Sequence, residues 1–194
     1  YKDFIFLVNY LRDIPHPTVT VLDTHDGICI PDVEGYLPPK LLNKLITNVS
    51  KKGTKSTKRH QKKGTEIDSV GGIYQLNCTF YEALNRDNFL YYCARAIQLF
   101  SPGIPQIYYN GLLAGINNFE LAESMKDPRG INRTRYSLEK AKEFIKTPLV
   151  ETLLQLMQLR RLHPSFNGYF SIHTTKYKHQ IHLSWTHEEY KTSL

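Results

Sequence analysis

The stretch Thr-Val-Thr-Val-Leu-Asp-Thr-His-Asp-Gly, residues 18–27, decides the fold. Residues 18–22 are rich in β-branched side chains, which favour a buried strand. Residues 23–27 then place titratable side chains and a glycine directly after that strand. Because chemistry in α/β enzymes lies at the carboxyl ends of strands, this order predicts an α/β fold with a site at residues 23–27.

Helices and strands alternate after this stretch. Apolar residues at helical spacing predict helices over 38–48 and 86–100, and residues 104–109 are expected to form a second strand that turns at Asn110-Gly111. This alternation is typical of βαβ units and predicts a parallel sheet or barrel. Two parallel strands and their helices cannot close a barrel and would leave exposed edges, so we expect the chain to be a section of a larger structure.

The C-terminal third predicts two more helices and a small β layer. Ser137 can cap a helix over 138–146, and Thr147-Pro148 can begin another that runs to about Leu162. Residues 169–173 and 180–185 are expected to be strands.

A basic segment accounts for the whole net charge of +7. Seven Lys and Arg residues, and no acidic residue, lie between Lys51 and Lys63. Because residues 49–66 have almost nothing to bury, we expect a flexible solvated loop there. The alternative is a tract that binds a polyanion, but no aromatic residue is interleaved with the charges, so we expect no nucleic-acid partner.

Other general features indicate a soluble, cytoplasmic globular protein. The cysteines, Cys29, Cys78 and Cys93, are odd in number and lack metal-ligand spacing, so we expect reduced thiols and no metal site. No apolar run reaches membrane-spanning length, so we expect no membrane partner. The first residues do not resemble a signal peptide, and the natural N-terminus is expected upstream.

Asp26 and His25 are the strongest candidates for chemistry. A carboxylate beside an imidazole can grip vicinal hydroxyls of a sugar, and the carboxylate can stabilise positive charge that develops on a substrate. The alternative is that both side chains satisfy the backbone of their own loop. The pattern alone does not decide between the two interpretations.

Four stretches, in order, resemble the sucrose phosphorylases of the alpha-amylase clan, glycoside hydrolase family 13. The first is Val-Thr-Val-Leu-Asp-Thr-His-Asp-Gly-Ile at 19–28, and the second is Ile-Tyr-Gln-Leu-Asn-Cys-Thr-Phe-Tyr-Glu-Ala-Leu at 73–84. The third, at 94–115, contains Gly-Ile-Pro-Gln-Ile-Tyr-Tyr, and the fourth is Arg-Gly-Ile-Asn-Arg-Thr-Arg-Tyr-Ser at 129–137. The resemblance runs from about residue 15 to residue 170.

This resemblance implies the C-terminal part of a (β/α)₈ barrel over residues 1–165 and the start of a β-sheet domain over 166–194. It implies retaining transfer of glucose from sucrose or a related α-glucoside to inorganic phosphate, with no cofactor. Asp26 would be the transition-state stabiliser, and His25 would donate to a neighbouring hydroxyl. The nucleophile and the acid/base would lie upstream of Tyr1, so we expect the isolated chain to be inactive.

The resemblance also implies residues that bind substrate. It matches a loop on the acceptor side of the site to Gly72, Ile73, Tyr74 and Gln75. Tyr74 would donate to phosphate or to the leaving sugar, and Gln75 would bind a sugar hydroxyl; alone, Tyr74 could equally be a core residue. Arg129 matches an active-site arginine that can bind sugar oxygens or a carboxylate, whereas a lone arginine is usually a surface residue. Tyr108 and Tyr109 are interpreted as barrel packing.

Departures from the family pattern leave the acceptor open. Gly72 stands where an acidic residue is expected, and Pro128-Arg129-Gly130 replaces the usual Gly-Arg-Asp. Sucrose, sucrose 6′-phosphate, glucosylglycerate and glucosylglycerol are the alternatives, and the basic segment could favour an anionic one. A hydrolase or transglucosylase of the same clan, or an inactive remnant or binding protein, is the competing interpretation. The pattern does not decide between a monomer and a homodimer.

Overall fold

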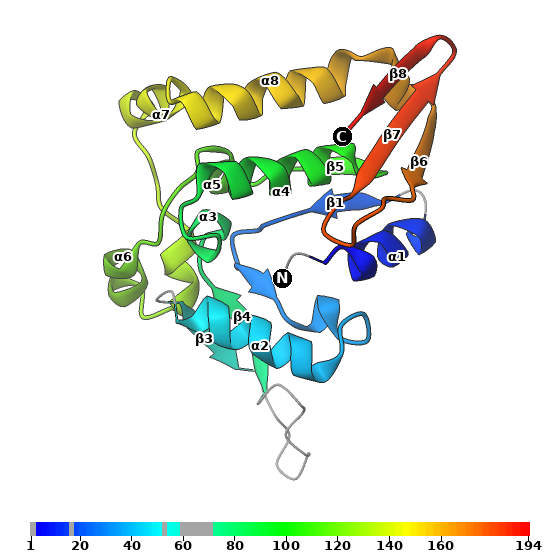
Figure 1. The fold of residues 1–194 in the computed structure, drawn as a ribbon. Helices are drawn as coiled ribbons and strands as arrows, with labels where there is room; N and C mark the ends of the chain where they lie inside the picture. Colours follow the sequence, from blue (N-terminus) through cyan, green and yellow to red (C-terminus); the bar gives the residue numbers. More distant parts are fainter. Residues whose placement is uncertain (1–2, 16–17, 52–53, 59–71) are drawn as a thin grey trace. The chain divides into compact units, whose positions relative to one another are not determined.

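The computed structural model describes residues 3–15, 18–51, 54–58 and 72–194 (Figure 1). Its residues form two compact units, each assembled from segments that are far apart in the sequence. Unit 1 comprises Tyr1–Leu22, Tyr92–Gln106 and Thr147–Leu194, and unit 2 comprises Asp23–Tyr91 and Ile107–Lys146.

Unit 1 contains a parallel pair of strands, β1 (Val19–Val21) and β5 (Ile104–Gln106). Helix α4 (Asn88–Phe100) leads into β5 and carries Gln98, whose side chain is buried. Gln98 Nε2 donates to the carbonyl of Thr20 at 3.1 Å and to that of Gln106 at 2.9 Å. One amide group thus ties the helix to both strands, and it satisfies two polar groups that would be costly to leave unpaired.

An antiparallel sheet of order β6-β7-β8 also belongs to unit 1. Its strands are β6 (Tyr169–His173), β7 (His182–His187) and β8 (Tyr190–Ser193). Trp185, the only tryptophan of the sequence, lies on β7 and is 7% exposed. Its Nε1 donates to the carbonyl of Phe100 at 2.8 Å, so the end of α4 is fixed to this sheet.

The remaining helices of unit 1 are α1 (Ile5–Asp13), α8 (Pro148–Leu162) and a 3₁₀ helix at Pro164–Asn167. Arg160 of α8 lies over the Trp185 ring, with its Cζ 4.7 Å from the centroid. Arg160 Nη2 also donates to the carbonyl of Gly103 at 2.9 Å. Guanidinium–aromatic stacking of this kind contributes about 0.5–2 kcal/mol.

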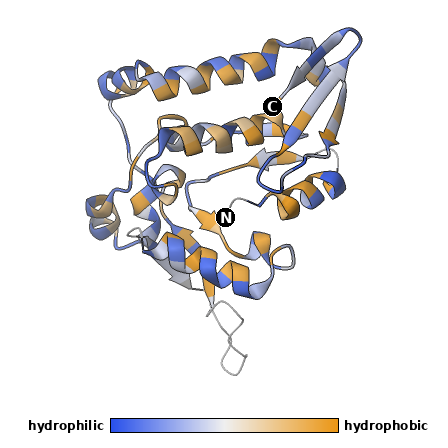
Figure 2. Ribbon diagram, viewed as in Figure 1, coloured by the Kyte–Doolittle hydropathy of each residue, from blue (hydrophilic) through white to orange (hydrophobic). Residues whose placement is uncertain are grey.

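Unit 2 is organised around an antiparallel sheet of order β2-β4-β3, with β2 (Ile28–Cys29), β3 (Lys55–Lys58) and β4 (Ile73–Asn77). Helix α2 (Pro39–Ser50) carries hydrophobic and hydrophilic residues in alternation along its length (Figure 2). Its apolar residues enter a core cluster with residues of the sheet region. The buried members of this cluster are Ile30, Leu42, Ile46, Val49, Leu76, Cys78 and Ala83.

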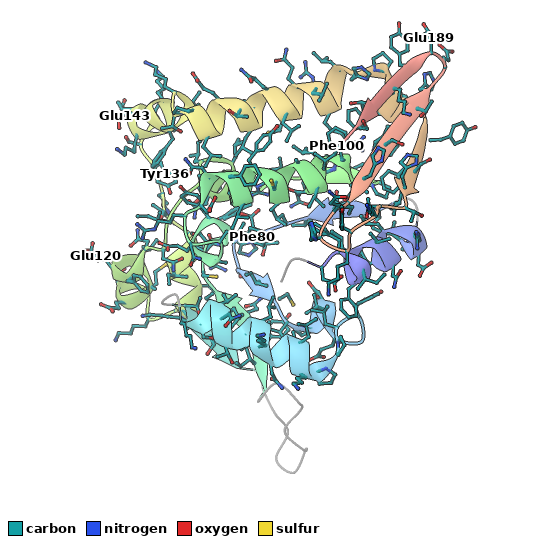
Figure 3. The ribbon with its side chains drawn as sticks, viewed as in Figure 1. Phe80, Phe100, Glu120, Tyr136, Glu143 and Glu189 are labelled. Atoms are coloured by element: carbon teal, nitrogen blue, oxygen red, sulfur yellow. The ribbon has the colours of Figure 1, made fainter. Side chains whose placement is uncertain are left out.

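Short helices complete unit 2. They are α3 (Phe80–Ala83), α5 (Tyr109–Leu112), α6 (Phe119–Ser124), α7 (Leu138–Ile145) and 3₁₀ helices at Pro31–Val33 and Pro128–Asn132. Thr79, Asn118, Asp127 and Ser137 each accept a backbone hydrogen bond at the start of one of these helices. Acidic side chains such as Glu120 of α6 and Glu143 of α7 point away from the ribbon into solvent (Figure 3).

Most of the predicted elements are confirmed. Strand β1, helices α2 and α4 and the parallel pairing of β1 with β5 agree with the sequence patterns. Ser137 caps α7, Pro148 is the first residue of α8, and β6 and β7 lie where two strands are expected.

The predicted loop at 49–66 is wrong at its start and at its centre. Residues 49–50 continue α2, and residues 55–58 form β3, which pairs with β4. Lys-Ser-Thr-Lys has no apolar residue, but an edge strand needs few of them, because its partner strand supplies the hydrogen bonds. Residues 59–66 lie outside the described residues.

Two other expectations need correction, and one strand was not predicted. The strand expected over 104–109 ends at Gln106, and Tyr109 begins the short helix α5. The hydroxyls of Tyr108 and Tyr109 donate hydrogen bonds here, and these bonds override the strand preference of aromatic residues. Residues 73–75, expected in a loop, belong to β4. The polar strand β8 has no counterpart among the sequence predictions.

Two broader expectations have different outcomes. The expected boundary between the barrel part and the β-sheet domain, at residues 165 and 166, stays a prediction. Within the described part of the chain, none of the helices has both the length and the apolar character needed to cross a bilayer.

We predict that Leu76→Ala destabilises the full-length protein by about 2–5 kcal/mol, because Leu76 is 0% exposed and its loss leaves a cavity in the unit 2 core. Leu138→Ala is the control, since Leu138 is 66% exposed and its truncation should cost less than about 0.5 kcal/mol. Urea unfolding of both variants checks the difference. Equal losses at the two positions would contradict this assignment of the core.

Candidate active site

The candidate site is built on a tight turn at residues 24–27, which we call the catalytic turn. The Gly27 N–H donates to the carbonyl of Thr24 at 3.3 Å, and the Asp26 N–H donates to the Thr24 hydroxyl at 3.2 Å. Gly27 has a φ of +93°, and a Cβ there would lie 2.4 Å from the carbonyl oxygen of Leu76. The turn therefore packs so closely against β4 that only glycine fits at this position.

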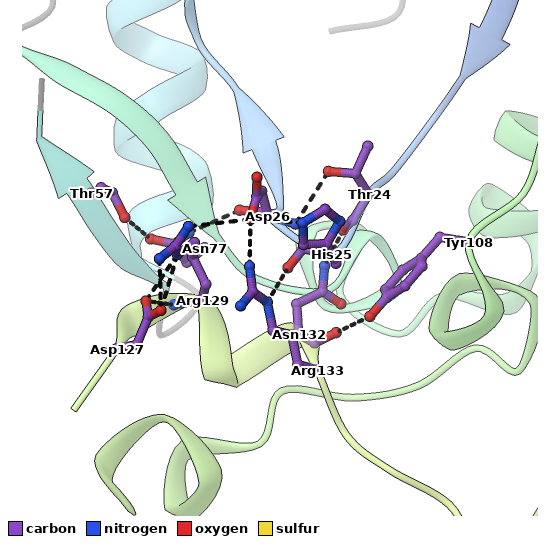
Figure 4. Close-up of polar contacts among 10 residues, drawn as sticks. All are labelled: Thr24, His25, Asp26, Thr57, Asn77, Tyr108, Asp127, Arg129, Asn132 and Arg133. Carbon is purple, nitrogen blue, oxygen red and sulfur yellow. Dashed lines mark hydrogen bonds and ion pairs between the residues drawn. The ribbon is translucent and has the colours of Figure 1, made fainter. Parts of the chain in front are cut away.

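Side chains from two other segments hold the peptide carbonyls of residues 24–26 (Figure 4). Asn132 Nδ2 lies 2.6 Å from the first carbonyl oxygen, Arg133 Nε lies 3.4 Å from the second, and Asn77 Nδ2 lies 2.8 Å from the third. Each of these nitrogens donates a hydrogen bond. The backbone of the turn is thus fixed from both sides, which pre-organises the side chains that it carries.

The carboxylate of Asp26 is surrounded by cationic and imidazole groups. Arg133 Nη2 lies 2.7 Å from Asp26 Oδ1, His25 Nε2 lies 3.4 Å from it and Arg129 Nη1 lies 4.0 Å from it. The Asp26 side chain is 29% exposed and that of His25 is 58% exposed, so a ligand can reach both. The group can therefore offer a negative charge and an imidazole donor to the same small polar molecule.

Arg129 is oriented by its neighbour Asp127. Arg129 Nε lies 3.1 Å from both carboxylate oxygens of Asp127, and its Nη2 lies 2.9 Å from Oδ2. The backbone N–H of Arg129 donates to the same carboxylate at 2.9 Å. The side-chain hydrogen bond and, next, the backbone hydrogen bond lower the pKa of Asp127. Nε and Nη2 of Arg129 therefore bind Asp127, and Nη1 is directed toward Asp26, where it can also contact a ligand.

A buried amide network supports Asn132 from behind. Asn110 Nδ2 donates to Asn132 Oδ1 at 3.0 Å, and the Tyr136 hydroxyl donates to Asn110 Oδ1 at 2.7 Å. The Tyr108 hydroxyl donates to the Asn132 carbonyl at 3.0 Å. Burial, with a smaller effect from Tyr109, raises the pKa of Tyr108, which keeps this hydroxyl protonated as a donor. Asn110 and Asn132 are 0% and 1% exposed, so their hydrogen bonds do not compete with water.

The structure brings together three of the residues predicted from the sequence: His25, Asp26 and Arg129. Gly72 precedes β4, and Ile73, Tyr74 and Gln75 lie on that strand, two to four residues before Asn77. Tyr74 is 41% exposed and Gln75 is 7% exposed. Within the described residues, no hydrogen bond or ion pair joins these two to the catalytic turn, and their acceptor-side roles stay predictions.

Sequence reasoning missed Arg133, Asn77 and Asn132. All three lie inside stretches that carry the family resemblance. Arg133 follows Arg129 by four residues, which is a signal that a second cation could reach the same carboxylate. The two asparagines give no such signal, because their role depends on which carbonyl the fold places opposite them.

The comparisons identify proteins similar to this chain over nearly its whole length. No protein-family model matches. The chain is 47% identical over 185 residues to the glucosylglycerol phosphorylase of Marinobacter adhaerens, and the match covers 95% of this chain and 38% of that protein. It is 38% identical over 190 residues to the sucrose phosphorylase of Agrobacterium vitis, with 94% and 38% covered.

A solved structure is also similar. The crystal structure of sucrose 6F-phosphate phosphorylase from Thermoanaerobacter thermosaccharolyticum matches with a TM-score of 0.93 at 37% identity, over 99% of this chain and 39% of that one. The chain thus has the predicted α/β fold, the C-terminal part of a (β/α)₈ barrel followed by the start of a β domain. It spans about 38% of the length of the curated relatives named here. The chain is homologous to phosphorylases of sucrose and related glucosides, as its sequence motifs indicated.

We predict that Gly27→Ala destabilises the protein by more than Gly35→Ala. Both glycines have positive φ, +93° and +84°, but a Cβ at Gly35 meets nothing within 4 Å. Gly35→Ala should therefore cost only backbone strain, about 1 kcal/mol, whereas Gly27→Ala adds a clash with the β4 backbone. Thermal unfolding of the two variants measures the difference. Equal costs would show that the close approach of the turn to β4 is absent.

We predict that the Asp127 carboxyl titrates below the ordinary value of about 3.9 and that Arg129→Gln raises its pKa. A depressed pKa in the folded state means that this ion pair stabilises the fold above pH ~4 and that the contribution is lost as the pH falls through the folded-state pKa. NMR titration of the carboxyl measures both values. Lys140→Gln, on the exposed surface of α7, is the control and should leave the Asp127 titration unchanged.

Proposed function

We propose that this chain is part of a retaining phosphorylase, which transfers glucose from an α-glucoside to inorganic phosphate and releases α-glucose 1-phosphate. The observation that carries the proposal is the ordered Asp26 carboxylate, with Arg133 at 2.7 Å and His25 at 3.4 Å, on a turn whose carbonyls are held. The similarity to a glucosylglycerol phosphorylase and a sucrose phosphorylase supports the same reaction class.

The chemistry needs what this turn offers. Retaining transfer passes through a transition state in which positive charge builds up on the sugar ring. In the proposed mechanism Asp26 accepts hydrogen bonds from two hydroxyls of the glucose and stabilises that charge, while His25 Nε2 donates to a neighbouring hydroxyl. Arg133 holds the carboxylate in place, so little reorganisation is needed as the charge develops. The nucleophile and the acid/base are expected in the part of the relatives that this chain does not span.

The acceptor side of the proposal involves two residues of β4. Tyr74, which is 41% exposed on β4, would donate to phosphate or to the leaving group, and Gln75 would bind a hydroxyl of that group. The relatives are named for different substrates, glucosylglycerol in one and sucrose in the other. We therefore propose the glucosyl donor as a class and leave its aglycone to the assay.

Location and assembly belong to the same proposal. A phosphorylase consumes inorganic phosphate and makes a charged sugar phosphate, which a cell retains, so we expect a cytoplasmic protein. A homodimer is the assembly that light scattering of the full-length protein should test.

We predict that Asp26→Asn in the full-length protein lowers kcat/KM for phosphorolysis by about 10²–10³-fold, as expected when one preorganised electrostatic group is lost. Release of glucose 1-phosphate is measured from sucrose, sucrose 6′-phosphate, glucosylglycerol and glucosylglycerate, with and without phosphate. Asp32→Asn, on an exposed carboxyl of the Pro31–Val33 helix, is the control and should keep full activity.

Three results would change the proposal. Release of free glucose without phosphate would make the protein a hydrolase. Full activity of the Asp26→Asn variant would remove Asp26 from the mechanism. No reaction with any of the four glucosides would leave the remnant or binding protein as the better explanation.

A further inference from the structure

Strand β3 reaches the catalytic turn through one buried side chain. The hydroxyl of Thr57 donates to Asn77 Oδ1 at 2.8 Å, and Asn77 Nδ2 donates to the carbonyl of Asp26 at 2.8 Å (Figure 4). Two consecutive hydrogen bonds therefore connect a residue of the basic segment with the backbone of Asp26.

The position of Asn77 makes this connection specific. Asn77 is 0% exposed, so water cannot replace a lost partner of its amide. The Asp26 carbonyl only accepts hydrogen bonds, which requires Nδ2 on that side and leaves Oδ1 toward Thr57. Without the Thr57 hydroxyl, Oδ1 is a buried acceptor with no donor, and only the bond to the Asp26 carbonyl still holds the amide in this orientation.

The strand geometry separates Thr57 from its neighbour. Side chains alternate between the two faces of a strand, so Ser56 points away from the side on which Thr57 meets Asn77. Ser56 is exposed, whereas Thr57 is half-buried. The two residues carry the same kind of hydroxyl on one strand. Within the described residues, only Thr57 of the two donates to Asn77 and is thereby connected to the turn.

We propose that Thr57 is a positioning residue for Asp26, which acts through Asn77 and contacts no substrate. The inference rests on the proposed function, because Asp26 is the group whose placement matters for glucosyl transfer. It also gives β3 a role in the site that does not depend on the positive charge of the basic segment. The strand orders the catalytic turn, whatever ligand the enzyme takes on its acceptor side.

The test compares Thr57→Val, Thr57→Ser and Ser56→Ala in the full-length enzyme. Thr57→Val keeps the shape and removes the donor, and we expect kcat/KM for glucose 1-phosphate release to fall about fivefold to tenfold, with the loss mainly in kcat. Thr57→Ser restores the hydroxyl and should recover most of the rate. Ser56→Ala should match the wild type.

Two further measurements distinguish positioning from a general loss of stability. In the Asp26→Asn background, Thr57→Val should cost less than about twofold, because the group that it positions has lost its charge. Hydrogen–deuterium exchange should accelerate at the Asp26 and Gly27 amides in Thr57→Val, with little change in the buried strands of unit 1.

The outcomes separate this inference from the proposed function. Accelerated exchange at the turn in an enzyme that phosphorolyses no glucoside would support the positioning role and reject the reaction. A Thr57→Val variant with wild-type rate and exchange would overturn the inference. It would equally be overturned if Thr57→Val cost the same factor with and without the Asp26 carboxylate, since that result describes a structural residue.

Discussion

The site depends on how the carbonyls of residues 24–26 are held. A turn of this length exposes peptide oxygens that would otherwise bond to water, and water allows the turn to move. Here two asparagine amides and one guanidinium take those positions. Their donors are themselves anchored by Asn110, by Thr57 and by the Asp26 carboxylate. The Asp26 carboxylate is therefore part of the framework that fixes its own backbone.

In unit 1, one buried side chain also holds backbone carbonyls in place. Gln98 donates to a carbonyl of β1 and to one of β5, and Arg95 Nη1 donates to Gln98 Oε1 at 2.9 Å. Both side chains are buried, at 5% and 1% exposure. Buried polar groups of this kind are costly unless they are fully paired, and when paired they specify one arrangement of helix and strands. In both units, amide groups determine geometry where apolar packing alone would allow several arrangements.

The sequence predicted most of the long helices and the first buried strand, but not α1, β2 or β4, nor the polar strands β3 and β8. Helices α2, α4 and α8 follow from apolar spacing and, for α2 and α8, from a proline at the first helical position. Strand β1 follows from its β-branched residues. Strands β3 and β8 were missed because Lys-Ser-Thr-Lys and Tyr-Lys-Thr-Ser resemble loops, and only the partner strand gives them order. Within the candidate site, the residue pattern after β1 singled out His25 and Asp26, and the family resemblance added Arg129. Asn77 and Asn132 could not be found from it, because an asparagine in a sequence does not reveal which carbonyl it will face.

The position of the single tryptophan determines what intrinsic fluorescence can report about the folding of this protein. Trp185 lies in unit 1, bonded to the end of α4 and stacked under the Arg160 guanidinium, whereas every residue of the candidate site lies in unit 2. Its emission therefore monitors one half of the described molecule and gives no direct signal from the other. A fluorescence melt and a circular-dichroism melt of this chain would report different events if the units lose their structure at different temperatures.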